Sequence, residues 1–544
     1  MTVLTLMVAA LFVGVVLVGV GDRLRLPWPV LLVLVGTAAA FVPGVEVPDL
    51  SPELILPLFL PPLLFATAQR TSWSVFRARW RSVLFLAVLL VAVTVVVVGA
   101  TVVWLIPGIA LGAALAVGAA VAPPDPVAVE AVAGPLRMPR RLVSVLQSEG
   151  LFNDATALVV FQAAVAATVA GEQPGARTAL LLLWAVVGAI AVGLGAAWLA
   201  GRLADRLTDP VAPSALTLVL PFAVYLAADA IEASGVIAVV VAALQTRQRA
   251  DADDVEQRLT GGAFWNVVEM LVTAAAFALI GLELRAVVGE AGDALPGMLV
   301  DAAIVAVVVI AVRALWMLGA LVAARRGTPT ASSAPRTLAE ATVLTWSGMR
   351  GLATLALALA MPRVTADGAP FPFRTELVII AAGVLVATLV LPGLTLPLLL
   401  RVLGVRESEE VGREAEQRLA ARARKAALTE LAALDREALG IDDTEGEEVL
   451  GELRARFARL GTGEGGPGGG FGGASGEEAA DRADYERRLE ALRRRREQWS
   501  RLQSLGLAAA RREVLAARAE PGVDPETADR VLQRLDVRSL AWSR

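Results

Sequence analysis

Long apolar stretches separated by short polar segments fill the first three quarters of the chain. Most of them are close to the roughly 20 residues that a helix needs to cross a hydrocarbon core. After Arg406 the sequence becomes charged and rich in alanine. The pattern therefore predicts an all-α polytopic membrane domain over residues 1–403 and a helical tail over 404–544.

Thirteen of the apolar stretches are predicted to be membrane-spanning helices. When the N-terminus is placed outside, most loop arginines fall in the inner loops, whereas the outer loops hold few arginines beside acids such as Glu46 and Asp49. This alternation is the positive-inside pattern, which places the tail in the cytoplasm. The predicted spans cover residues 2–20, 28–43, 54–69, 81–106, 109–133, 142–170, 178–201, 213–229, 233–247, 264–284, 297–324, 338–361 and 374–402.

Two of the predicted helices are interrupted. The fifth contains the run Ala122-Pro123-Pro124-Asp125-Pro126, and a proline lacks an N–H and clashes with the preceding helical turn. The twelfth contains the run Ser347-Gly348-Met349-Arg350-Gly351. Thirteen helices suit two inverted six-helix repeats joined by a linking helix, so the fifth and twelfth occupy corresponding places. In transporters of this kind the site lies where such interrupted helices meet.

The composition excludes several classes of protein. Hydrophobic residues make up 56% of the chain and charged residues only 19%, below the roughly 25% of soluble proteins, which excludes a soluble enzyme of this size. A net charge of -4 indicates neither a nucleic-acid partner nor an acidic substrate. Without cysteine or histidine the chain has no thiol, imidazole or Cys/His-ligated metal chemistry. A carboxylate is therefore the expected carrier of any proton handled near neutral pH.

Asp154 is the strongest candidate for that carboxylate. It follows Asn153 inside the sixth predicted span, where a charge costs about 2.5 kcal/mol or more and is usually functional or paired. Glu149 and Asn153 lie four residues apart and share a helix face, with Asp154 about 100° further round. Because burial disfavours a charged carboxylate, Asp154 would bind a proton or a cation but not both. A capping or paired carboxylate is the alternative.

Other charges in the predicted spans are ranked below Asp154. Asp125 lies at the break of the fifth span, where unwound carbonyls and half-helix ends can coordinate a monovalent cation; a helix cap is the alternative. Arg350 is expected to pair with Glu149, either for function or as a purely structural ion pair. Arg313, in the eleventh span, is expected to form a structural pair with Glu269.

Six motifs resemble those of the monovalent cation:proton antiporter family, which includes bacterial and animal sodium/proton exchangers. The resemblance covers essentially the whole membrane domain. It implies a plasma-membrane antiporter that exchanges Na⁺ (or Li⁺) for H⁺ without a cofactor, as a homodimer with elevator-type movement. The motifs are Leu60 to Phe65, Asp125 to Val129, Glu149 to Ala155, Ser234 to Ala238, Phe277 to Glu283 and Gly348 to Gly351.

The resemblance also implies roles for single residues. Asp154 would be the carboxylate shared by cation and proton, with Asn153 and Asp125 supporting it and Glu149 paired with Arg350. The Asn-Asp sequence implies electroneutral exchange. The supporting residues would be Arg350, Pro124, Gly150 and Ser347.

Four residues depart from the family pattern. Pro124 replaces a usual threonine and Gly150 a common serine, so two hydroxyl ligands are missing, while Ala66 and Thr67 stand where many bacterial members carry an acid. A K⁺/H⁺ antiporter with an altered ion shell therefore remains the alternative function.

The remaining classes fit less well. A membrane enzyme would need Ser/Lys or Asp/Asp chemistry, yet the only lysine, Lys425, lies in the tail. A channel would need a continuous polar pore. In the tail, helices are expected over about 411–440 and 480–518, with a Gly-rich linker at 461–476. The tail is expected to be regulatory or dimer-supporting, with an unknown regulator, and the expected partners are membrane lipid and a second copy, not nucleic acid.

Overall fold

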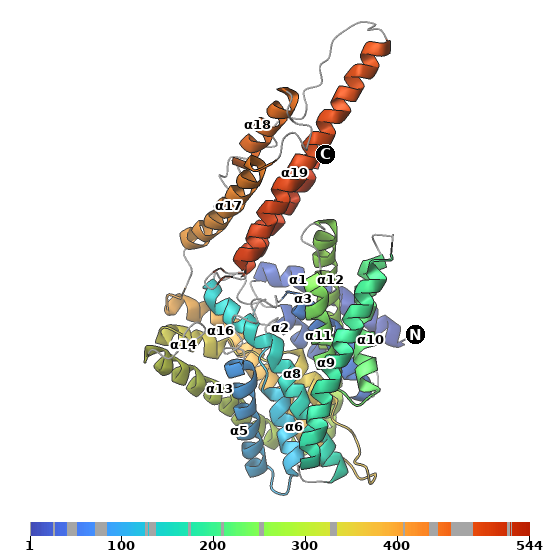
Figure 1. Ribbon diagram of the computed structural model, residues 1–544. Helices are drawn as coiled ribbons and strands as arrows, with labels where there is room; N and C mark the ends of the chain where they lie inside the picture. The colour runs from blue at the N-terminus through green and yellow to red at the C-terminus, as the bar shows by residue number, and fades with distance from the viewer. Residues whose placement is uncertain are drawn as a thin grey trace. The chain divides into compact units, whose positions relative to one another are not determined.

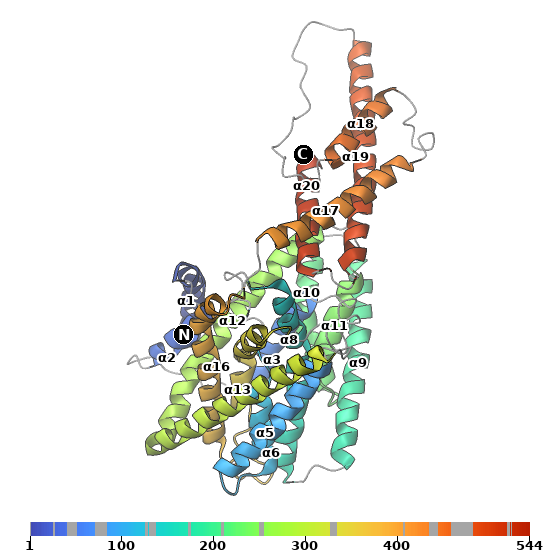
Figure 2. The same cartoon turned by 90° about the vertical axis from the view of Figure 1, so that its left-hand side faces the viewer.

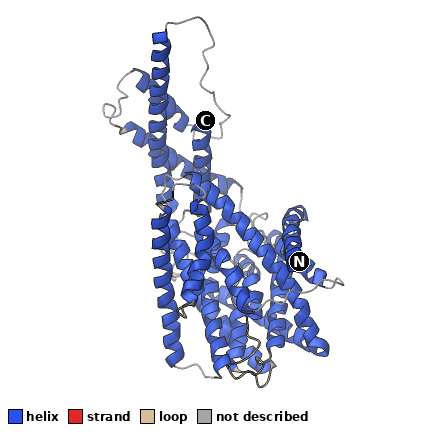
Figure 3. Ribbon diagram, turned by 90° about the vertical axis from the view of Figure 1, so that its right-hand side faces the viewer, coloured by secondary structure: helices blue, strands red, loops and turns tan. Residues whose placement is uncertain are grey.

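The computed structural model is helical across the residues that it describes, and no strand is found among them (Figure 3). The chain forms two compact units, residues 1–249 with 261–407, and residues 250–260 with 408–544, which are described separately below. The described residues are 2–24, 28–40, 52–70, 84–125, 129, 138–171, 176–207, 212–249, 255–326, 335–405, 409–434, 444–458, 482–518, 520, 523 and 525–543.

Each predicted span contains helix in the first unit (Figure 1). Among the described residues, five helical stretches are long and apolar enough to cross a membrane, and several apolar helices are shorter. That all thirteen spans cross, in two inverted halves, stays a prediction. The helices are α1 (Thr2–Leu24), α2 (Trp28–Ala40), α3 (Pro52–Arg70), the π-helical η1 (Leu84–Leu89) with α5 (Leu90–Leu105), α6 (Leu111–Val121), α8 (Arg140–Ala170), α9 (Ala176–Ala204), α10 (Ala212–Asp229), α11 (Gly235–Arg249), α12 (Val255–Ala291), η3 (Gly292–Ala294), α13 (Leu295–Arg325), α14 (Leu338–Trp346), α15 (Leu352–Leu359) and α16 (Arg374–Val402).

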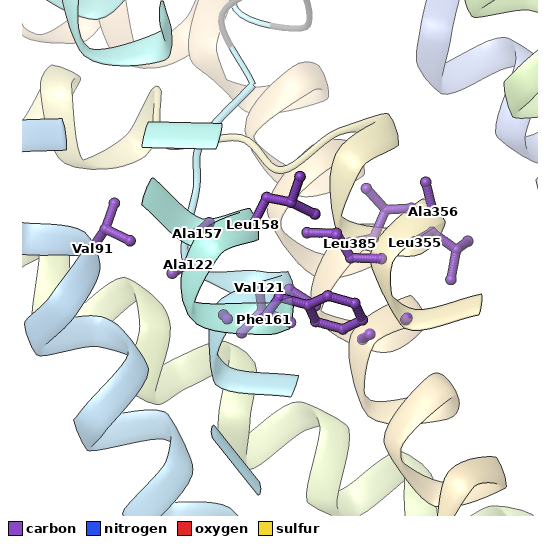
Figure 4. Close-up of a cluster of buried hydrophobic side chains, with 14 of the residues drawn as sticks. Val91, Val121, Ala122, Ala157, Leu158, Phe161, Leu355, Ala356 and Leu385 are labelled. Atoms are coloured by element: carbon purple, nitrogen blue, oxygen red, sulfur yellow. The ribbon is translucent and has the colours of Figure 1, made fainter. Parts of the chain in front are cut away.

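The short helix α6 lies at the centre of the first unit. All its residues except Leu111 and Leu115 are buried, and it packs against α5, α8, α15 and α16. Small residues permit this close packing, as is typical between membrane helices. A Cβ built at Gly118 would lie only 2.7 Å from the Val95 carbonyl oxygen of α5. Figure 4 shows Val121 and Ala122, at the end of α6, beside Leu158 and Phe161 of α8.

Large apolar side chains remain exposed on the outer helices. Trp104 of α5 is 74% exposed, and Leu315 of α13 is 70% exposed. Figure 2 shows α13 running past α5 and α16, against which it packs. Exposed apolar area of this extent is unusual for a soluble monomer and suits contact with lipid.

The second unit is a helical domain with its own core. Its helices are α17 (Glu409–Ala432), α18 (Thr444–Ala458), α19 (Arg482–Arg518) and α20 (Pro525–Ser543). Leu419, Ala423, Ala427 and Leu431 of α17 recur every four residues and form one buried stripe, as an amphipathic helix requires. Helices α17 and α19 fall in the two stretches expected from the sequence, whereas the 461–476 linker lies outside the described residues. Helix α18 was not expected; its apolar residues become buried only by packing on α17 and α19.

Candidate functional site

The two predicted interruptions meet in the first unit. Helix α6 ends at Val121, and the chain from Ala122 to Asp125 is not helical, while α14 and α15 are separated by residues 347–351. The Asp125 N–H donates to the Met349 carbonyl oxygen at 2.7 Å. The Asp125 carboxylate lies so close to Gly351 that any Cβ at Gly351 would overlap it. The two broken segments are therefore in direct contact.

Arg350 is bound to the end of α6. Its Nε donates to the Val121 carbonyl at 2.9 Å and one terminal nitrogen donates to the Ala122 carbonyl at 3.1 Å, while the other bonds the Gly348 carbonyl. The side chain is buried. Carbonyls at a helix C-terminus lack intrahelical partners and carry partial negative charge. The buried Arg350 guanidinium supplies them with both hydrogen-bond donors and a positive charge.

Glu149 pairs with Arg313 rather than with Arg350. Both terminal nitrogens of Arg313 donate to the Glu149 carboxylate, at 2.5 and 2.9 Å, and its Nε donates to the Leu344 carbonyl at 3.0 Å. The predicted pairs Glu149–Arg350 and Arg313–Glu269 are both wrong. Arg350 instead donates to carbonyls that the interruption leaves without helical partners. Both terminal nitrogens of Arg313 donate to Glu149. Glu269 is also buried and has an interaction of its own.

Asn153 connects α8 to the interruption of the fifth span. Its side-chain nitrogen donates to the Pro124 carbonyl at 2.8 Å, and its side-chain oxygen accepts from the Asp154 N–H at 2.6 Å. Asn153 is completely buried. The Pro124 carbonyl is thus bound to Asn153, and the Pro124 side chain offers no hydroxyl to the site.

Asp154 lies partly buried beside this link. Its negative charge and that of Asp125 repel each other electrostatically. Neither Arg313 nor Arg350 pairs with Asp154 in the described part of the chain, because these side chains are bound to Glu149 and to backbone carbonyls. Two mutually repelling carboxylates in poorly hydrated surroundings attract a positive charge, whether a proton or a cation.

The other predicted site residues lie around this contact. Gly150 is buried one helical turn before Asp154, and Ser347 is completely buried at the end of α14. Sequence reasoning missed Thr354, which is completely buried three residues after Gly351. The signal was a lone hydroxyl in the first turn after a break. No cluster of three or more Asp, Glu, His or Cys side chains was found among the described residues.

Comparisons with known proteins agree with this architecture. Residues 7–402 match the family model described as the transmembrane sodium/hydrogen exchanger. The chain is 35% identical over 444 residues to an uncharacterised Na⁺/H⁺ exchanger of Mycobacterium tuberculosis, covering 79% of each chain. It is 33% identical over 386 residues to a sodium, potassium, lithium and rubidium/H⁺ antiporter of Bacillus pumilus, covering 68% of this chain and 57% of that one. The fold matches a sodium proton antiporter of Methanocaldococcus jannaschii with a TM-score of 0.57 at 19% identity, covering 72% of this chain and all of that one.

Proposed function

The chain belongs to the sodium/hydrogen exchanger family, and from this premise we propose that it exchanges Na⁺ or Li⁺ for H⁺ by competition at Asp154. The family match confirms the resemblance found in the sequence and makes the chain a multi-pass membrane transporter. The observation that carries the proposal is the surroundings of Asp154. It lies on α8 beside the meeting interruptions, and the buried arginines near it are bound to other groups.

The proposed mechanism follows from charge balance. A protonated Asp154 is neutral, and it must release its proton before its carboxylate can bind a cation. Asp125 strengthens the attraction for the cation through its nearby charge. Asn153 holds the Asp154 backbone against the Pro124 carbonyl and thereby fixes the distance between α8 and the interrupted fifth span.

The proposed stoichiometry is one proton for one monovalent cation. Asn153 is neutral, and Asp154 is the residue proposed to exchange its proton, so each turnover replaces one positive charge by another. We further propose a homodimer in a cell membrane, with the N-terminus outside and the tail inside, in which an elevator-type movement exposes the site to each side in turn. The positive-inside pattern of the loops supports this orientation.

A K⁺/H⁺ antiporter is the second candidate. Two observations favour it. Pro124 and Gly150 bring no side-chain hydroxyl to the carboxylates, which leaves the ion shell less crowded. Two bacterial relatives, from Bacillus pumilus and Bacillus subtilis, are named as antiporters of sodium, potassium, lithium and rubidium. The assay below therefore compares Na⁺, Li⁺ and K⁺ to determine which cation the protein exchanges.

The test is dequenching of a pH-sensitive dye in everted vesicles on addition of Na⁺, Li⁺ or K⁺. Asp154→Asn is expected to abolish the response to every cation, because an amide cannot exchange a proton. Asp293→Asn, which changes an exposed carboxyl in the short helix η3, is the matched control and is expected to behave as wild type. The proposal is contradicted if no cation causes dequenching with the wild-type protein, or if Asp154→Asn gives the same dequenching as wild type.

A further inference from the structure

Two hydroxyl groups, one on each side of the break in the twelfth span, are buried and have no hydrogen-bond partner among the described residues. They belong to Ser347, at the end of α14, and Thr354, in the first turn of α15. Both side chains are completely buried, and neither hydroxyl oxygen bonds any described group. Buried polar atoms are nearly always hydrogen-bonded, so two exceptions at one break require an explanation.

Thr354 differs from eight other threonines in the described helices. In a helix, a threonine hydroxyl commonly donates to the carbonyl four residues back. For Thr354 that carbonyl belongs to Arg350, which lies in the break, so the usual acceptor is not in helical position. The usual bond is made by Thr67, Thr94, Thr101, Thr168, Thr342, Thr345, Thr388 and Thr395.

The position of Thr354 in the chain is close to the proposed ion site. Its N–H donates to the carbonyl of Gly351, the N-cap residue of α15, at 3.2 Å, so Thr354 lies in the first turn of the helix that starts at the break. Gly351 is the residue against which the Asp125 carboxylate packs. Helix α15 also packs against α6 and against α8, which carries Asp154. Thr354 is therefore about one turn along α15 from the contact between Gly351 and the Asp125 carboxylate.

We propose that the Thr354 hydroxyl, assisted by Ser347, is an oxygen ligand of the transported monovalent cation and sets the affinity for it. This inference rests on the proposed antiport function. A hydroxyl oxygen has two lone pairs and binds a cation without adding negative charge. Pro124, directly before Asp125, and Gly150, one helical turn before Asp154, carry no hydroxyl. The hydroxyls are thus supplied by the twelfth span instead.

The experiment compares Thr354→Val, which keeps the shape and removes the hydroxyl, with Thr354→Ser, which keeps the hydroxyl. Cation binding is measured by the rise in Tm of the purified full-length protein on addition of Na⁺, Li⁺ or K⁺. Transport is measured as the apparent KM in everted vesicles. Thr354→Val is expected to raise the KM for the preferred cation about tenfold and to reduce the Tm rise, since one ligand is lost. Thr354→Ser is expected to stay within about twofold of wild type.

Thr388→Val is the matched control. Thr388 of α16 is equally buried, at 1% exposure, but its hydroxyl donates to the Val384 carbonyl at 2.7 Å. It lies within a regular helix, and its substitution is expected to leave the cation KM unchanged. Ser347→Ala is expected to raise the KM by a smaller factor than Thr354→Val.

The possible outcomes separate this inference from the proposed function. A wild-type protein that no cation stabilises and that shows no exchange would overturn both. Normal exchange with an equal KM in wild type and Thr354→Val would overturn the ligand role alone. A Thr354→Val protein that fails to fold, while Thr354→Ser folds, would mean that the hydroxyl holds the structure together, and it would also overturn the ligand role. We expect instead that, without added cation, Thr354→Val has a Tm at or above that of wild type, since an unsatisfied buried hydroxyl is removed.

Discussion

Glu149 of α8 and Arg313 of α13 form a two-pronged ion pair whose side chains are only 1% and 2% exposed. The pair joins elements that are far apart in the sequence, and Arg313 also binds the Leu344 carbonyl of α14. Taking two charges out of water is costly, so such a pair adds little net stability compared with apolar residues of the same size. Losing one partner, however, leaves an unpaired buried charge.

We therefore predict unequal effects of single and double substitutions at this pair. Arg313→Met alone is expected to destabilise the protein by about 3–5 kcal/mol, whereas Arg313→Met with Glu149→Leu is expected to recover most of that loss. The measurement is the shift in thermal or denaturant unfolding of the full-length protein. The exposed pair Arg418–Glu414 is the control, with an expected effect below about 1 kcal/mol. A single substitution as mild as this control would contradict the prediction.

A second prediction concerns the contact between Gly351 and Asp125. Gly351→Ala would place a methyl group on the Asp125 carboxylate, and the two interruptions would have to separate. We expect at least a tenfold loss of exchange in vesicles, because the proposed site is built at this contact. Gly319→Ala in α13 is the control, since a Cβ there meets nothing within 4 Å. Equal activity of the two variants would show that the contact is not needed for exchange.

Much of this architecture could be predicted from the sequence, but the partners of the buried charges could not. Apolar length located the helices, and the proline and glycine runs located both interruptions, because these residues act on their own local backbone. The partner of Glu149 depends instead on how α8 and α13 are rotated about their axes, which no local pattern specifies. Arg350 found carbonyl partners that exist only because α6 ends at Val121. The Thr354 hydroxyl bonds no group in the described part of the chain, and this likewise depends on where α15 begins.

The tail gives a third prediction, on pH. Arg422 of α17 donates to Glu513 and to Glu520, and this bonding lowers the pKa of Glu520 below its ordinary value of 4.5. A lowered folded-state pKa contributes stability that is present above the ordinary value and lost as the pH falls through the folded value. Protection of α17 from hydrogen exchange in the full-length protein is thus expected to fall below about pH 4.5 in wild type.

Glu520→Gln tests whether the Glu520 carboxyl group causes this loss of protection in acid. Without the carboxylate, the protection of α17 at pH 7 is expected to be lower, and part of its decline in acid is expected to disappear. Glu497→Gln, which changes an exposed residue of α19, is the control and is expected to keep the wild-type pH profile. An unchanged profile in Glu520→Gln would assign the acid sensitivity to other carboxyl groups.

The last prediction concerns the number of protons that compete with one cation. If Asp154 binds either species, but never both, the apparent KM for the preferred cation depends on proton concentration to the first power. Below the pKa of the free site, KM is then expected to rise about tenfold for each unit that the pH falls, with maximal velocity unchanged when the cation saturates. Vesicle exchange measured at several fixed pH values gives this slope directly.

A slope of two would mean that Asp125 and Asp154 both release a proton on cation binding, and the proposed one-for-one exchange would be wrong. Asp125→Asn separates these cases. With one competing proton, the substitution is expected to raise the KM by weakening the attraction for the cation, and the slope stays at one. With two competing protons, the slope is expected to fall from two in wild type to one in the variant.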